Sequence, residues 1–559
     1  MSVSTILQQF ASQDLPRSLE IFAPELLLCA TILLLLLGRL IGFDRKIPAS
    51  WIALLGGMVA FTAAFTQFMY LKSGGEPTGV ISDLAYVLRI TEAGVGTPGP
   101  YFTGLLMHDH FGMFFRLGLL LFLVLVIALT ALTGIPDNED APDFYTLLCG
   151  SMVGMLVAVS ANHLLMAFLA VEMMSVPSYA MVGFLKGRRA SSEASFKYVV
   201  YGAGAAGVML YGISLLSGLL GTAAFPQFAE RFDLLVGNQF SFTNANATLI
   251  ALAMLMILVG FAFKLSVFPF HFWCPDAFEG AAAEVGGYLS VASKAASFGL
   301  LIRFALAFQG TSPALKEFLT FFGIALGVLA CLSMTFGNLA AYTQTNVKRL
   351  LAYSTIAHAG YMLLGVSALL VIQGSSVPVG VDIPEQSARA VEGLTYYIVV
   401  YLFMNLVAFA TVALLRNEIF SEKIEDYRGL ISENGATKVL CICLLVSFFS
   451  LVGLPPFGGF FGKFLIFASA FKAGWIHWAM WVFVVIAGLN TVFSLFYYLG
   501  VLKAMFIRPA PEHRRPLKTP GIVGAYVALI TIPILVLGAS PLQDDLSKTA
   551  HYVAAKLFE

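Results

Sequence analysis

Long apolar runs alternate with short polar segments along almost the whole chain. A helix needs about 20 mostly apolar residues to cross the hydrocarbon core of a bilayer, and fourteen runs are of about this length. We therefore predict an all-α, polytopic membrane protein with fourteen transmembrane helices. The predicted spans are Ile21–Leu40, Trp51–Tyr70, Phe111–Leu132, Phe144–Ser160, His163–Leu185, Tyr198–Leu220, Ala247–Phe270, Gly287–Phe308, Phe318–Ala341, Leu350–Ile372, Leu394–Leu415, Val439–Phe467, Ile476–Val501 and Ile522–Leu537.

Two of these runs are too long for one straight crossing. The stretch 144–185 has 42 residues, and we divide it at Ala161-Asn162-His163. The twelfth span contains Pro455-Pro456. Proline removes a backbone donor and clashes with the preceding turn, so this span is expected to be broken.

Basic residues are distributed unevenly between alternate loops. With the N-terminus outside, the inside loops carry 18 Lys and Arg residues and the outside segments carry 9. Because cytoplasmic loops are enriched in Lys and Arg, we expect both termini to lie outside.

The composition agrees with a membrane protein. Hydrophobic residues make up 59 % of the chain and charged residues 11 %, and the mean hydropathy is +0.85. Soluble domains contain about 25 % charged residues, so a soluble fold, a disordered chain and a nucleic-acid-binding protein are excluded. Lys plus Arg and Asp plus Glu number 32 each, so the net charge indicates no electrostatic partner. The six cysteines form no CxxC pair, which argues against a disulfide framework or an iron–sulfur site. No cleaved signal peptide is expected, because no basic segment precedes a short apolar core.

The loop from Leu71 to His110 is long and contains Gly74-Gly75 and a Gly/Pro-rich tract at 94–100. We expect a structured extramembrane cap or hairpin. The run His108-Asp109-His110 resembles a metal cluster, but a loop that leads into the next span is the favoured interpretation, so no metal site is predicted.

The chain also matches itself weakly at an offset of 199 residues. The matching segments are five spans apart. Because five is an odd number, the second unit would be inverted relative to the first, as in many transporters. The alternative is a chance coincidence of Gly-Phe-Lys runs in a Phe-rich chain. The matching residues are Glu193 with Glu392, Tyr198-Val199-Val200 with Tyr397-Ile398-Val399, Gly260-Phe261 with Gly459-Phe460, and Lys264 with Lys463. The predicted organisation is 1–110 for two spans and an extramembrane loop, 111–143 for the third span and a connecting loop, 144–308 and 309–505 for the two five-helix repeats, and 506–559 for the last span and the C-terminal tail.

Four ionisable residues lie inside predicted spans: Glu172, Lys264, Lys294 and Lys463. A charge at mid-bilayer costs about 2.5–3.5 kcal/mol or more, so each is a functional candidate. Lys264 and Lys463 lie near prolines, and a broken helix in lipid is tolerated only against protein or water. We expect two broken spans at the bundle interior, each beside a lysine.

Lys294 has a different setting, because Ser290, Ser293 and Ser297 surround it on its helix. These hydroxyls could bind an ammonium group or a chain of water. The four charges together favour a proton relay, and static ion pairs that hold the bundle together are the alternative.

Several other polar residues are assigned secondary roles. His358 is interpreted either as a relay group or, with slight preference, as a packed and hydrogen-bonded histidine. Glu193 and Lys197 are expected to form an i,i+4 pair at the membrane interface. Arg116 and Arg303 are expected to be anchors near span ends that snorkel to the interface. No bis-histidine pattern suggests haem, and no P-loop suggests ATP.

Four sequence stretches carry a family resemblance: AVEMMSVPSY at 170–179, FKYVVYGA at 196–203, NVKRLLAYS at 346–354 with IAH at 356–358, and GLPPFGGF at 453–460. They resemble the antiporter-like subunits of respiratory complex I, the NADH–quinone oxidoreductase, and within that group look most like subunit N, called subunit 2 in mitochondria. The resemblance covers roughly residues 110 to 505.

The resemblance implies a proton-translocating subunit of the bacterial inner membrane with fourteen spans and two inverted five-helix repeats. It implies that this chain carries no cofactor, that flavin, iron–sulfur clusters and quinone are bound by partner subunits, and that its partners are other membrane subunits, including antiporter-like ones, and lipids. The family's relay residues correspond to Glu172, Lys264, Lys294 and Lys463. Related readings are a cation/proton antiporter subunit, a membrane subunit of a membrane-bound hydrogenase, or an inactive scaffold of such a complex.

The chain departs from the family at one point. After Glu279-Gly280 the family usually reads Ala-Pro-Thr, whereas this chain reads Ala-Ala-Ala followed by Glu284. The missing proline and the added carboxylate bear on the start of the eighth span and on local proton entry.

Overall fold

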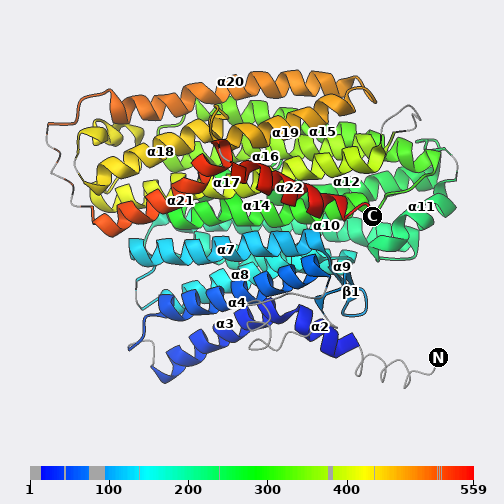
Figure 1. The fold of residues 1–559 in the computed structure, drawn as a ribbon, viewed down its shortest axis with the longest axis horizontal. Coiled ribbons are helices and arrows are strands. Elements are labelled where there is room, and N and C mark those ends of the chain that lie inside the picture. The colour runs from blue at the N-terminus through cyan, green and yellow to red at the C-terminus, as the bar shows by residue number, and fades with distance from the viewer. Residues whose placement is uncertain are drawn as a thin grey trace.

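The computed structural model describes residues 14–42, 46–74, 95–137, 139–237, 239–375, 382–433, 435–512, 514, 517, 519–539 and 541–559. Long helices lie side by side along the longest dimension of the molecule (Figure 1). The helices are α2 (Leu15–Ile21), α3 (Ala23–Ile41), α4 (Ala49–Ser73), α7 (His110–Thr133), α8 (Ala141–Ser160), α9 (Leu164–Val182), α10 (Arg189–Leu220), α11 (Phe228–Val236), α12 (Ala245–Leu265), α13 (Trp273–Gly280), α14 (Ala283–Leu306), α15 (Pro313–Ala341), α16 (Val347–Gln373), α17 (Ile383–Ile419), α18 (Ala436–Val452), α19 (Gly458–Ala473), α20 (Ala479–Phe506), α21 (Gly521–Ala539) and α22 (Pro541–Ala555).

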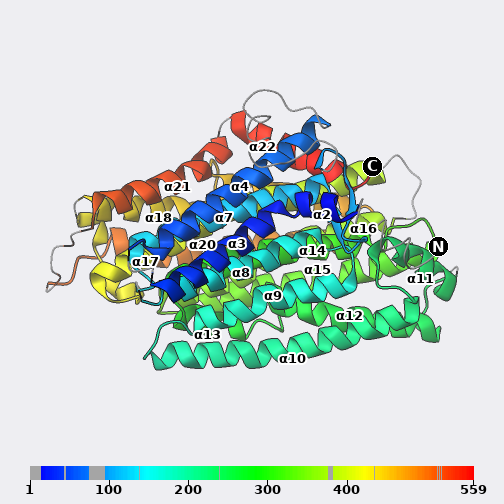
Figure 2. The ribbon, with the colours of Figure 1, turned by 90° about the horizontal axis from the view of Figure 1, so that it is seen from below.

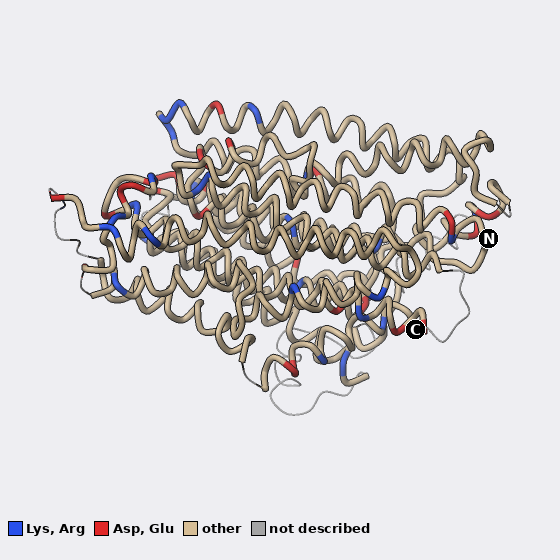
Figure 3. Tube along the Cα trace, turned by 90° about the horizontal axis from the view of Figure 1, so that it is seen from above, with Lys and Arg blue, Asp and Glu red and all other residues tan. Residues whose placement is uncertain are grey.

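Thirteen of the described helices are long and apolar enough to cross a membrane, and a fourteenth is counted when α18 is joined to the bent segment before it. The all-α, polytopic prediction is confirmed. The division of the stretch 144–185 is also confirmed, because α8 ends at Ser160 and α9 begins at Leu164. Charged residues gather toward the two ends of the long axis, with only a few in the middle (Figure 3).

Three helices, α14, α16 and α17, form the centre of the bundle, and nearly all of their residues are buried. The helices α3, α10 and α20 lie at edges of the bundle (Figures 1 and 2) and expose apolar side chains such as Leu33, Tyr211 and Val485. Exposed apolar residues on the outermost helices are what a lipid-facing surface requires. The central helices are enclosed, and α12 and α19, which carry Lys264 and Lys463, pack against α14 and α17 respectively.

Two spans are broken, as the prolines predict. In the seventh predicted span α12 ends early, at Leu265, and the short α13 follows after the break, from Trp273; the twelfth predicted span divides into α18 and α19. Ser266, with a φ of 58°, ends α12, and Gly453, with a φ of 89°, ends α18. The two breaks lie on opposite sides of their lysines, because Lys264 precedes the first break and Lys463 follows the second.

The long loop before α7 contains a small antiparallel hairpin, in which β1 (Gly99–Tyr101) pairs with β2 (Leu106–His108). This part of the loop matches the expected hairpin, and residues 75–94 lie outside the described residues. His108 Nε2 donates to the carbonyl of Val95 at 2.9 Å, and Asp109 caps α7 by accepting from the amide of Gly112 at 2.7 Å. Burial lowers the pKa of His108 to about 4. The two side chains therefore have structural roles here.

The expectation that Arg116 is a snorkelling anchor is wrong. Arg116 is fully buried, and its Nε donates to Glu25 Oε1 at 2.9 Å. The pair joins α7 to α3, two segments 91 residues apart in the chain. Arg303 is also enclosed, and it donates to Asp109 Oδ1 at 2.6 Å and to the carbonyl of Val159 at 2.5 Å. Each guanidinium group is bound by a carboxylate on another segment, so neither has to reach water at the membrane interface.

The end of the bundle that contains α13 is called the α13 end, and the end that contains β1 and β2 is called the hairpin end.

Candidate proton relay

The ammonium group of Lys294 lies at the C-terminal end of a broken helix. It projects from the central helix α14 and donates to the carbonyl of Leu265 at 2.5 Å and to Ser266 Oγ at 3.0 Å. Both acceptors belong to the last residues of α12. The last carbonyls of a helix have no intrahelical partner and carry the negative end of the helix dipole. The break in α12 therefore creates a binding site for the charge on α14.

The ammonium group of Lys463 is held in the same way in the other half of the molecule. It projects from α19 and donates to the carbonyls of Leu451 at 2.9 Å and Val452 at 3.1 Å, at the end of α18. Gly453 follows directly, and a Cβ added there would lie 3.1 Å from Lys463 Cδ. Each broken helix thus ends on the ammonium group of a lysine.

Lys264 differs from the other two lysines. It lies in the last turn of α12, is buried, and donates to Ser175 Oγ on α9 at 3.0 Å. Glu172 interacts with it electrostatically but forms no direct ion pair with it among the described residues. The two charges are therefore neighbours without being in contact.

Glu172 is half-buried and lies on the outward face of α9. Its neighbours at helical spacing are the exposed apolar residues Leu165, Leu169 and Val176, which are 57 %, 46 % and 58 % exposed. The carboxylate therefore lies between Lys264 and an apolar outer surface.

His358 lies at the centre of a group of tyrosines between the two broken helices. Its Nδ1 is 2.6 Å from the hydroxyl of Tyr397, and its Nε2 is 3.4 Å from that of Tyr498. Its ring lies 5.2 Å from that of Tyr401. Lys463 lies over the ring of Tyr361, with Nζ 4.4 Å from the centroid. His358 is thus hydrogen-bonded and packed, and it connects the surroundings of Lys463 with those of α17.

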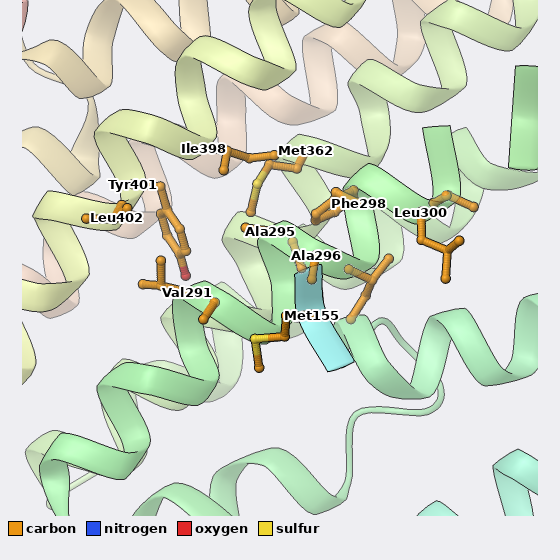
Figure 4. Packing of buried hydrophobic residues seen from close by; sticks show 14 of the residues in the cluster. Met155, Val291, Ala295, Ala296, Phe298, Leu300, Met362, Ile398, Tyr401 and Leu402 are labelled. Atoms are coloured by element: carbon orange, nitrogen blue, oxygen red, sulfur yellow. The ribbon is translucent and has the colours of Figure 1, made fainter. Parts of the chain in front are cut away.

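Tyr401 lies between this group and Lys294. It extends from α17 toward α14 beside Val291 (Figure 4), and its hydroxyl has no hydrogen-bond partner among the described residues. It interacts electrostatically with Cys274, which in turn interacts with Lys294. Cys274 and Tyr401 are therefore electrostatically coupled neighbours between Lys294 and the tyrosine group around His358.

The expected pair of Glu193 and Lys197 is present, with 2.8 Å between Lys197 Nζ and Glu193 Oε1. Lys197 also pairs with Asp276 on α13 at 2.8 Å, and Arg349 on α16 binds Asp276 at 2.6 Å. These ion pairs join α10, α13 and α16 at the α13 end. They hold the short segment α13 in place and lie away from the buried lysines.

Sequence reasoning did not find the groups that surround the lysines. Tyr397 and Tyr401 are spaced i,i+4 in an apolar span, which is the one local signal that could have found them. Ser175 and Ser266 gave no such signal, because their partners are 89 and 28 residues away in the chain. Lys348 is one of the 18 basic residues that were assigned to the inside loops. It is buried at the start of α16 and pairs with Glu422 at 2.9 Å.

Comparison with known proteins places this arrangement in a family. Residues 161–491, more than half of the chain, match the family described as NADH:quinone oxidoreductase/Mrp antiporter, TM. NADH-quinone oxidoreductase subunit N of Anaeromyxobacter sp. (strain Fw109-5) is 37 % identical over 78 % of this chain and 82 % of its own length. Subunit N 2 of Sorangium cellulosum (strain So ce56) is 35 % identical over 95 % and 97 %.

A solved structure agrees with these relatives. A chain of respiratory complex I from Thermus thermophilus with bound aureothin is 29 % identical, and the match covers 92 % of this chain and 96 % of that chain with a TM-score of 0.66. The chain described here therefore belongs to the NADH:quinone oxidoreductase/Mrp antiporter family, together with the N subunits of NADH-quinone oxidoreductase.

Proposed function

We propose that this protein is the proton-translocating subunit N of a bacterial complex I and that Glu172, Lys264, Lys294 and Lys463 form its proton relay. Quinone reduction elsewhere in the complex drives proton transfer along this row. The observation that carries the proposal is that all three lysines are buried near the centre of the bundle, with ammonium groups bound only to hydroxyl and carbonyl oxygens.

The surroundings of the lysines support transfer between them. Lys264 and Lys294 interact electrostatically, and Tyr401 and His358 lie between Lys294 and Lys463. All three lysines are buried. An ammonium group that faced lipid would have excluded a relay. His358 is the middle group of this row, and Glu193 and Lys197 belong to the ion-pair network at the α13 end.

The sidedness follows from charge. The α13 end contains the loops that the Lys and Arg distribution assigns to the inside, among them those with Lys197 and Arg349. The hairpin end and both termini then lie on the outer side of the bacterial inner membrane. Partner subunits provide flavin, iron–sulfur clusters and quinone, and this chain contributes none of them.

The outward position of Glu172 suits a place beside another subunit. A carboxylate on an exposed apolar helix face would be costly against lipid, whereas a neighbouring antiporter-like membrane subunit could solvate it. The N subunits of related bacteria and the complex I chain of Thermus thermophilus support this assignment over a separate cation/proton antiporter or a hydrogenase subunit.

One experiment tests identity and relay together. The tagged chain is purified from its native membrane, partner subunits are identified, and the complex is reconstituted in proteoliposomes. Lys264→Ala and Lys463→Ala are expected to assemble but to lower quinone reduction and proton pumping together. Co-purification without flavin and iron–sulfur subunits would contradict the identity. Unchanged turnover with unchanged pumping in both variants would contradict the relay.

A further inference from the structure

Glu284, in the first turn of α14, is a buried carboxylate that the relay described above does not use. It is 2 % exposed, and neither carboxylate oxygen has a hydrogen-bond partner among the described residues. Buried polar groups are nearly always hydrogen-bonded, and an isolated buried charge is very costly. Such a group must bind a proton or water.

The groups that face Glu284 hold it between its two charge states. Arg416 on α17 and Lys348 on α16 interact with it electrostatically, as does Tyr145 on α8, and Thr133 on α7 lies beside it. Both basic groups are already bound by Glu422, at 3.3 Å for Arg416 and 2.9 Å for Lys348. One excess positive charge thus favours the ionised carboxylate, while burial favours the protonated one.

Glu284 and Lys294 lie on the same helix. Ten residues separate them, or roughly 15 Å at a rise of 1.5 Å per residue. The helix α17 runs antiparallel beside α14, because Phe409 packs on Gly287 while Ile398 and Ala295 line the same small cavity. A proton that leaves Glu284 therefore has a continuous helix interface to follow.

Two buried polar side chains of α17 that have no hydrogen-bond partner among the described residues lie along this interface, Asn405 and Tyr401. In the antiparallel register Asn405 lies between the levels of Glu284 and Lys294, and Tyr401 is level with Lys294. Unsatisfied buried polar atoms mark places where water can bind. Together they provide binding positions for a water chain between Glu284 and Lys294.

The side chain of Phe409 lies between the levels of Glu284 and Asn405 on this interface. A Cβ added at Gly286 would lie 3.0 Å from Cε1 of this ring, and one added at Gly287 would lie 3.0 Å from Cβ and 3.4 Å from Cγ of Phe409. The two glycines therefore allow Phe409 to pack directly on the α14 backbone. Phe278 of α13 contacts the same ring, with centroids 5.8 Å apart. A hydrophobic side chain across a narrow polar path can gate it by excluding water, and its contact with α13 couples it to the broken helix.

We propose that Glu284 is the proton-loading site of this subunit at the α13 end and that Phe409 gates transfer from it to Lys294. A carboxylate oxygen of Glu284 takes a proton from water at the α13 end. When Phe409 moves aside, the proton passes along bound water to the unprotonated amine of Lys294, and Glu284 returns to the carboxylate. Only O–H and N–H bonds form and break. This inference rests on the proposed relay.

The test uses the whole complex in proteoliposomes. Glu284→Gln keeps the shape of the side chain but cannot carry a proton. Loss of a positioned acid–base group lowers rates by about 10²-fold or more. We expect about tenfold lower pumping, because water can still reach the interface. Glu279→Gln is the matched control, since Glu279 is a surface carboxylate on α13 that pairs with Arg349 and should pump like the wild type.

A second readout separates proton loading from a structural role. Infrared difference spectra recorded during turnover should show a protonated-carboxyl band that is present in the wild type and in Glu279→Gln and absent in Glu284→Gln. Wild-type pumping by Glu284→Gln, or an unchanged infrared band, would overturn the proposal. If Glu284→Gln does not assemble, Glu284→Asp decides, because a displaced carboxyl should shift the pH profile of pumping, and an unshifted profile would overturn the proposal.

A parallel variant, Lys294→Ala, distinguishes this inference from the proposed function. If Lys294→Ala abolishes pumping while Glu284→Gln does not reduce it, only the loading site is wrong. If both variants pump normally, the relay itself is wrong.

Discussion

The sharpest prediction concerns Gly453, which ends α18 beside Lys463. We predict that Gly453→Ala lowers proton pumping per quinone reduced. Gly453 has a φ of 89°, and an L-residue in the left-handed region costs about 1–2 kcal/mol. The new Cβ would also lie 3.1 Å from Lys463 Cδ and 3.8 Å from Nζ. The lysine must then shift by a few tenths of an ångström.

The shift acts on the two bonds that hold the ammonium group. Lys463 donates to the carbonyls of Leu451 and Val452 at 2.9 and 3.1 Å. A hydrogen bond to a charged group contributes about 1.5–3 kcal/mol. Because each 1.4 kcal/mol corresponds to about a factor of ten, the loss of one such bond lowers the occupancy of this ammonium position by about tenfold. Pumping should fall by a similar factor.

A matched variant separates backbone strain from the effect on Lys463. Gly221 ends α10 with a φ of 66°, and a Cβ added there meets nothing within 4 Å. Gly221→Ala should carry a similar backbone cost and pump normally. Pumping and NADH–quinone turnover are measured for both variants in proteoliposomes, and thermal unfolding reports stability. Equal pumping by Gly453→Ala and Gly221→Ala at equal turnover would refute the reasoning.

Three further predictions concern other parts of the molecule. Glu172→Gln should impair pumping while Glu172→Asp should be milder, because the charge near Lys264 is what matters; equal loss of pumping would indicate a packing role. Glu25→Ala should destabilise the complex by about 3–5 kcal/mol, because it leaves Arg116 buried without a counter-charge, whereas Glu25→Leu with Arg116→Met should recover most of this in thermal unfolding. Burial lowers the pKa of His108 to about 4 from 6.5, so the opened hairpin binds a proton that the folded one excludes. Hydrogen-exchange protection of β2 should therefore fall as the pH is lowered from 6.5 toward 4, and His108→Gln should remove this dependence.

The spans, the broken helices and the buried charges could be predicted because each leaves a local mark. An apolar run identifies a span, a proline identifies a break, and a single lysine in an apolar run identifies a buried charge. Lys264, Lys294 and Lys463 all belong to this class.

The partners of these charges could not be predicted, because they come from distant segments. Lys294 binds the end of α12, and Arg116 binds Glu25 91 residues away. Arg116 and Arg303 lie near span ends and therefore fit the pattern of anchors, but that pattern does not reveal a buried counter-charge on another helix. The C-terminal segment expected as a tail instead contains α22. Its His551 Nδ1 lies 3.0 Å from Glu392 Oε2 on α17, and this contact is not visible in the sequence.

The buried basic groups have two kinds of partner. Arg116 and Lys348 bind the carboxylates of Glu25 and Glu422, and a full negative charge at contact distance favours the charged form of the group that it binds. Lys294 and Lys463 instead bind the ends of α12 and α18, where the helix dipole corresponds to only about half a charge. A helix end therefore stabilises the charged form of a buried lysine less than a carboxylate does. At about 8 Å and an effective dielectric of 20, a neighbouring ammonium group contributes roughly 2 kcal/mol of repulsion, which is comparable with what separates the two states. In the proposed relay, broken helices in place of acidic partners would allow one protonated lysine to displace the proton of the next.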